Sequence, residues 1–192
     1  MRVVLVALVL GAVPVMAADP SDAKRIAEAT SPLPEHLRSG AKVVMTNADE
    51  SERVLRSGSN GFVCGTDDPG PGFAVGCFES GLREFFGTAI PLMTKASSPA
   101  EGLDLIDAAI GDGSLSPPTP GSRGYVLSGP DRERAKQTLA IFVPGATAKS
   151  TGLSTERSDG TWLMCPGTPG AHIMVGDITY GQDEEFWKTC GR

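Results

Sequence analysis

Residues 41–65 read AKVVMTNADESERVLRSGSNGFVCG and contain three short segments separated by turn residues. The segments are 42–45, 53–56 and 61–64, and each contains the valine, leucine or phenylalanine that strands favour. Asn60-Gly61 is a strong turn dipeptide, and residues 47–50 are also turn-like. This stretch therefore predicts an antiparallel three-stranded meander.

Helices are predicted before and after this meander in the sequence. Short helices are expected at 19–29 and 35–38, before it. After it, the helical spacing of Phe78, Leu82, Phe85, Phe86 and Ile90 predicts an amphipathic helix that Pro91 ends or kinks. The Ser98-Pro99-Ala100-Glu101 stretch carries the start signals of a further helix, with this buried stripe: Leu103, Ile106 and Ile110.

The last third of the chain is predicted to be mainly strands. The loop 111–124 holds three prolines, and a loop of this length is expected to be mobile or functional. The segments expected as strands are 125–127, 138–143, 161–165 and 171–178, followed by a helical turn at 184–189. The predicted fold class is α+β: an antiparallel β-sheet with a few helices packed on one side, loop-rich and disulfide-stapled.

Length and charge narrow the class of protein. A chain of 192 residues has room for one domain with one core. Its net charge is −6, and it has no basic patch of the kind that nucleic-acid binding needs. We therefore expect no nucleic-acid partner.

The first eighteen residues have the pattern of a secretory signal peptide. Arg2 precedes an apolar run from Val3 to Val13, and small residues close the segment at Ala17 and Ala18. The alternative is an N-terminal membrane anchor, although the run is short for a membrane span. We expect residues 19–192 to form a single exported domain, periplasmic or secreted, with no transmembrane segment in the mature chain.

The four cysteines are expected to form two disulfides in an exported protein. Three pairings are possible. We favour Cys64–Cys77 and Cys165–Cys190, because each closes a short local loop. The spacing argues against a zinc site, so no metal and no cofactor are expected.

Two blocks of sequence resemble a family of uncharacterised exported bacterial proteins. The first block is NGFVC at 60–64 with DDP at 67–69 and Cys77, and the second is GTPGAHIMV at 167–175. The resemblance supports the pairing of Cys64 with Cys77 but implies no activity. This chain departs from the family pattern where the family carries aromatic residues: Phe62 (Trp), Cys165 (Trp) and Gly170 (Tyr).

His172, Asp67 and Asp68 are the candidate catalytic residues. His172 opens a predicted strand after a Gly-Thr-Pro turn, where it could ligate a metal, act as a base or satisfy backbone groups. Asp67 and Asp68 could supply carboxylates, although adjacent acids before a proline are commonly turn residues. The two aspartates come near His172 only if the two blocks meet in space.

Three functions are compatible with the sequence. The favoured one is a non-enzymatic exported module that binds a ligand or an envelope partner through a patch of aromatic residues such as Trp162, Tyr180 and Trp187. A structural envelope protein would show a partner interface and no pocket. The alternative enzyme, small and metal-assisted or His-based, would use His172 with Asp67 or Asp68. No nucleophile motif is present, so we lean away from catalysis.

Overall fold

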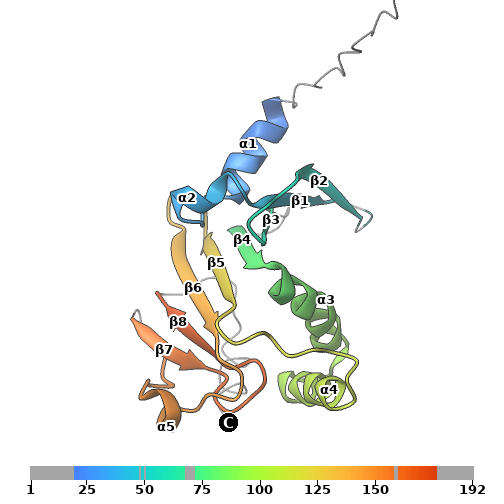
Figure 1. Ribbon diagram of the computed structural model, residues 1–192, viewed down its shortest axis with the longest axis vertical. Helices are drawn as coiled ribbons and strands as arrows, with labels where there is room; N and C mark the ends of the chain where they lie inside the picture. Colours follow the sequence, from blue (N-terminus) through green and yellow to red (C-terminus); the bar gives the residue numbers. More distant parts are fainter. Residues whose placement is uncertain (1–19, 48, 50, 68–71, 158–159, 177–192) are drawn as a thin grey trace, which may run out of the picture.

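The computed structural model describes residues 20–47, 49, 51–67, 72–157 and 160–176, and these form an α+β fold (Figure 1). The strands make one eight-stranded sheet of order β2-β1-β3-β4-β5-β6-β8-β7. The fold class expected from the sequence is confirmed. The helices are α1 (Pro20–Ala29), α2 (Glu35–Arg38), α3 (Ser80–Lys95), α4 (Pro99–Gly111) and α5 (Ala148–Thr151). The strands are β1 (Lys42–Thr46), β2 (Glu52–Arg56), β3 (Phe62–Gly65), β4 (Phe73–Glu79), β5 (Arg123–Gly129), β6 (Lys136–Phe142), β7 (Thr161–Met164) and β8 (His172–Val175).

The antiparallel meander predicted for residues 41–65 is wrong, both in the order of the three strands and in the direction of one pairing. β1 pairs antiparallel with β2, but it also pairs parallel with β3, so β1 lies between them. The backbone N–H groups of Ser59 and Asn60 both donate to the carbonyl of Gly40, which holds the β2–β3 connection beside the start of β1. Residues 57–61 therefore carry the chain past the end of β1 instead of turning it back beside β2.

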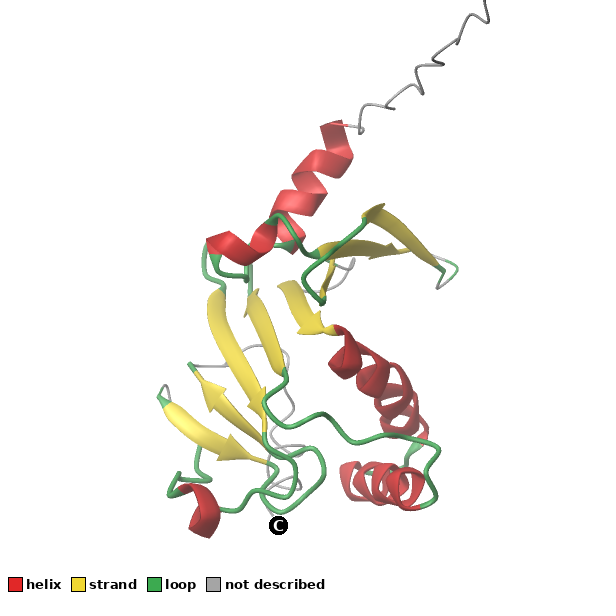
Figure 2. Ribbon diagram, in the orientation of Figure 1, coloured by secondary structure: helices red, strands yellow, loops and turns green. Residues whose placement is uncertain are grey.

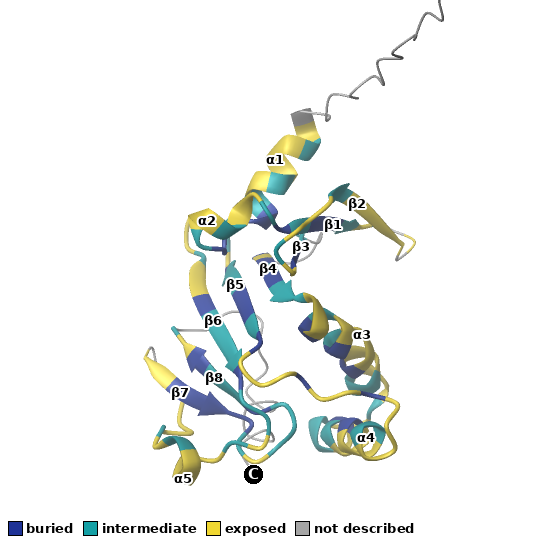
Figure 3. Cartoon of the chain, viewed as in Figure 1, coloured by how far each residue is buried: buried dark blue, intermediate teal, exposed yellow. Residues whose placement is uncertain are grey.

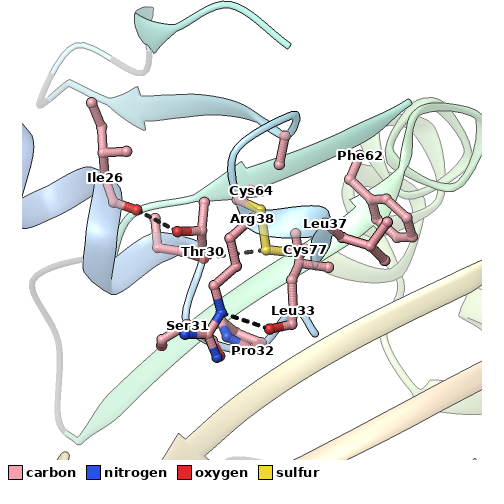
Figure 4. The surroundings of a disulfide bond; sticks show 12 residues. Ile26, Thr30, Ser31, Pro32, Leu33, Leu37, Arg38, Phe62, Cys64 and Cys77 are labelled. Carbon is pink, nitrogen blue, oxygen red and sulfur yellow. Dashed lines mark hydrogen bonds between the residues drawn. A yellow bond between two sulfur atoms is a disulfide. The ribbon is translucent and has the colours of Figure 1, made fainter. Parts of the chain in front are cut away.

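The Cys64–Cys77 disulfide lies at the centre of the main core, and this predicted pairing is confirmed (Figure 4). The two cysteines face each other across β3 and β4. Residues of α1, α2 and the segment joining them surround the bond, and the Sγ atom of Cys77 lies 3.2 Å from the carbonyl oxygen of Ala29. The core around the bond includes Ala29, Leu33, Ala41, Val43, Phe62 and Tyr125.

The helix expected from Phe78 begins two residues later, because Phe78 belongs to β4. The helix α3 also continues through Pro91 to Lys95. The Phe86 ring of α3 packs edge-on against the rings of Phe78 and Phe142, with centroids 5.4 and 5.8 Å away. Successive residues of a strand point to opposite faces, so Cys77 and Phe78 place α1 and α3 on opposite faces of the sheet. In this respect the helices differ from the expected one-sided packing.

The helices α3 and α4 form a hairpin at one end of the molecule, from which a long loop returns to β5 (Figure 2). The predicted start of α4 is confirmed: the Glu101 N–H donates to the Ser98 side chain, and the Ser97 N–H donates to Glu101 Oε2. The helices approach closely where Gly102 faces Met93, since a Cβ at Gly102 would lie 2.5 Å from Met93 Sδ. The hairpin has its own apolar cluster, of which Phe85, Ala89, Ile106 and Leu115 are the buried members.

The hairpin and its returning loop are an excursion between two neighbouring strands. β4 and β5 pair antiparallel, and Phe78 is opposite Gly124 in their register. The chain therefore leaves the sheet after Glu79 and re-enters it at Arg123. Glu79 Oε1 accepts hydrogen bonds from Nε and Nη2 of Arg123, at 3.0 and 2.7 Å, so an ion pair joins the two ends of the excursion.

The four strands expected in the last third are present, with shifted bounds. β5 and β6 are longer than predicted, and β8 covers only His172–Val175 of the expected 171–178. Residues 177 and 178 lie outside the described residues, as does the helical turn expected at 184–189. The polar stretch after β6 contains the short helix α5, whose Thr147 side chain accepts from the Ser150 N–H.

Candidate functional site

His172 lies at the start of β8, packed face to face on Phe142 of β6. The ring centroids are 4.7 Å apart and the rings are nearly parallel. Nδ1 of His172 is 2.7 Å from the carbonyl oxygen of Gly170. Because a carbonyl only accepts, Nδ1 carries the proton in this contact. Burial lowers the pKa of His172 below its usual 6.5, and the hydrogen bond to Gly170 opposes that shift in part. The ring is thus held neutral, as a hydrogen-bonded structural histidine would be.

The structure does not bring Asp67 to His172. Asp67 follows β3 and accepts a 2.8 Å hydrogen bond from the Ala74 N–H of β4. Strands β4, β5 and β6 lie between β3 and β8, which places the two residues about 19 Å apart across the sheet. The two residues also lie toward opposite ends of the strands. Ala74, which donates to Asp67, is in register through Ser128 with Lys136 at the start of β6, whereas His172 is opposite Phe142 at the end of β6. Asp68 lies outside the described residues.

The other residues singled out in the sequence are the cysteines of the second disulfide and the members of the suggested aromatic patch. Cys165 follows β7 and is disulfide-bonded, while its predicted partner Cys190 lies outside the described residues. Trp162 is 3% exposed and belongs to the core, so it is not part of a surface aromatic patch. Tyr180 and Trp187, the other two residues suggested for that patch, also lie outside the described residues.

Two further observations concern metals and membranes. In the described part of the chain, no three His, Cys, Asp or Glu side chains gather in a way that could hold a metal ion. None of the helices found there is both long and apolar enough to cross a membrane.

A pocket of about 320 Å³ lies between α3 and the loop that returns from α4. Ligand pockets typically measure roughly 300–1,000 Å³, so this one is at the small end of the range. The α3 residues on its wall occur at helical spacing and share one face of the helix. The residues lining the pocket are Gly81, Glu84, Phe85, Thr88, Ser114, Leu115, Ser116, Pro117 and Thr119.

The loop wall of this pocket is anchored at both ends. At the α4 end, Ser114 Oγ and the Leu115 N–H both donate to the carbonyl of Ala109. At the β5 end, the Ser122 hydroxyl donates to the carbonyl of Thr119 at 2.6 Å. The loop is largely exposed (Figure 3), but Leu115, Pro118 and Ser122 are buried. The loop was expected to be mobile or functional, and these contacts give the pocket a formed wall.

Several polar side chains of the pocket have no partner among the described residues. The structure gives no hydrogen bond or ion pair to the side chains of Glu84, Thr88, Ser116 or Thr119. The neighbouring Arg83 pairs instead with Glu52 of β2. One exposed carboxylate and three exposed hydroxyls are therefore available to a ligand, and the side chains of Phe85 and Leu115 line the same pocket.

The sequence pattern does not predict this pocket. It indicates a mobile or functional loop at 111–124 and, for α3, an amphipathic helix. The available signal was the Gly81, Glu84 and Thr88 spacing on the face of α3 beside the buried stripe.

Comparisons with protein-family models, with curated proteins and with solved structures find no match to this chain. The resemblance to exported bacterial proteins therefore remains a prediction.

Proposed function

We propose that this chain is an exported binding module that holds a small polar ligand in the pocket between α3 and the 111–124 loop. The observation that carries the proposal is the anchored concave wall lined by polar side chains without partners. Hydrogen bonds at both ends already hold the loop wall, so little backbone entropy is lost there when a ligand binds, which favours recognition.

The chemistry of the lining favours binding over catalysis. A serine or threonine hydroxyl becomes a nucleophile only beside a base such as histidine. Among the described residues that line the pocket, three hydroxyls have no partner, and there is no histidine, lysine or cysteine; the one carboxylate, Glu84, makes no hydrogen bond to a hydroxyl. The alternative enzyme built on His172 gains no support from the described residues, because Asp67 lies far across the sheet from His172.

Export is part of the proposal and is supported by the buried Cys64–Cys77 disulfide. Disulfides of this kind form and persist in oxidising compartments such as the periplasm or the medium. The predicted signal peptide at 1–18 lies outside the described residues.

Amide chemical-shift mapping of the ¹⁵N-labelled, oxidised protein tests the binding site. We would titrate small neutral and charged sugars to millimolar concentration. We expect at least one of them to shift the amides of Gly81, Thr88 and Ser116 in a saturable way. If the protein is folded and none of these amides moves, the proposal is wrong.

A further inference from the structure

We propose that the pocket selects a small molecule that carries an ammonium group beside hydroxyl groups, as an amino sugar does. This inference rests on the proposed function, since it names the ligand class of the same pocket.

The charge of the lining selects against anions. Among the described residues that line the pocket, Glu84 is the only charged one, and no lysine, arginine or histidine accompanies it. Asp112 lies just before the loop wall, where it accepts a 2.9 Å hydrogen bond from the Ser114 N–H. Hydrogen bonding to the Ser114 side chain, and then to its backbone N–H, lowers the pKa of Asp112, so this second carboxylate beside the loop wall stays negative.

The N-terminal end of α3 favours an anion, which opposes the effect of the two carboxylates. A helix carries about half a positive charge at that end, and Gly81 lies in the first turn. The full negative charge of Glu84 exceeds this partial charge. The protein as a whole is also acidic, with a net charge of −6, which raises the local concentration of cations.

The hydroxyls explain why the ligand should be more than a bare ammonium ion. Thr88, Ser116 and Thr119 can each donate and accept a hydrogen bond, as the hydroxyls of a sugar do. Phe85 and Leu115, which are 6% and 5% exposed, add a small apolar part to the lining that the C–H groups of a sugar can contact. An ammonium group donates three hydrogen bonds, which suits one carboxylate with hydroxyls around it.

The test compares four sugars of one ring type: glucosamine, glucose, N-acetylglucosamine and glucuronate. Shift mapping reports where each one binds and its dissociation constant. We expect glucosamine to shift the amides of Gly81, Thr88 and Ser116, and to bind about fivefold more tightly than glucose, the gain expected from one solvent-exposed ion pair. The preference should shrink as salt is added.

Two variants assign the preference to the pocket. Glu84→Gln keeps the size of the side chain and removes its charge, so it should bring glucosamine down to the affinity of glucose. Glu133→Gln removes an exposed carboxylate from the β5–β6 connection and should change nothing.

The outcomes separate this inference from the proposed function. If glucose, N-acetylglucosamine or glucuronate binds the pocket as tightly as glucosamine, the ammonium preference is wrong and the binding site stands. A glucosamine preference that survives in Glu84→Gln would also overturn the inference. If no sugar moves the pocket amides of the folded protein, the proposed function itself fails.

Discussion

Removing the Cys64–Cys77 disulfide should destabilise the protein by about 3 kcal/mol through the unfolded state alone. The bond closes a loop with a sequence separation of 13 residues. The chain-entropy relation gives about 3 kcal/mol for a loop of this size. Loss of the two fully buried sulfur atoms adds to this cost, because α1 and α2 pack around them. For a chain of this length, 3 kcal/mol corresponds to a fall in Tm of roughly 6–12 °C.

The variant to make is Cys64→Ala with Cys77→Ala, unfolded in urea and followed by circular dichroism without reductant. Val75→Ala serves as the packing control, since Val75 is 2% exposed and lies on the same face of β4 as Cys77. That control should cost about 2 kcal/mol for its lost methyl groups and the space they leave. If the double variant loses no more stability than Val75→Ala, the cross-link contributes nothing beyond packing and the reasoning is refuted.

Three further predictions concern stability elsewhere in the fold. Ser98→Ala removes the hydrogen bond to the Glu101 N–H and should cost about 1 kcal/mol in urea unfolding; an unchanged midpoint would mean that the cap contributes nothing. Thr138→Val should stabilise the protein by about 1 kcal/mol, because the Thr138 hydroxyl is buried and has no hydrogen-bond partner in the described structure; a loss of stability would reveal a partner. Since the pKa of His172 is lower in the folded protein than in the unfolded chain, the unfolded chain binds more protons and stability should fall as the pH drops below about 6.5. His172→Gln should flatten that fall between pH 7 and 5, and an equal slope in the variant would assign it to other groups.

Local signals predicted much of the secondary structure. The start of α4 depends on contacts among Ser97, Ser98 and Glu101, which are neighbours in the sequence, so the pattern was sufficient. The two short N-terminal helices, α1 and α2, were also expected at nearly their observed bounds.

Strand partners could not be predicted in this way. Residues 42–64 have strand character, but nothing in their pattern says that β1 pairs parallel with β3. Phe78 fits the helical spacing of the residues that follow it, yet it belongs to β4, where pairing with β5 decides its conformation. Pairing across the sheet also separates Asp67 from His172, which were candidates together only if the two blocks that contain them met in space.

The pocket could not be predicted from the sequence, because the residues that line it form no known binding or catalytic motif. Glu84, Thr88 and Ser116 are common on protein surfaces, and only the path of the loop brings Ser116 opposite α3. Recognition of such a site needs the tertiary fold.

The Glu79–Arg123 ion pair marks the base of a segment, 80–122, that contains all the described residues lining the pocket. β4 and β5 are adjacent and antiparallel, so a tight turn could join them without changing the register of any strand. If the proposed pocket binds a ligand, the segment 80–122 can therefore change its length and ligand preference while the strand pairing and the disulfide stay the same. Relatives of this protein would then share the sheet and differ between these two strands, and a ligand found for one of them would not transfer to the others.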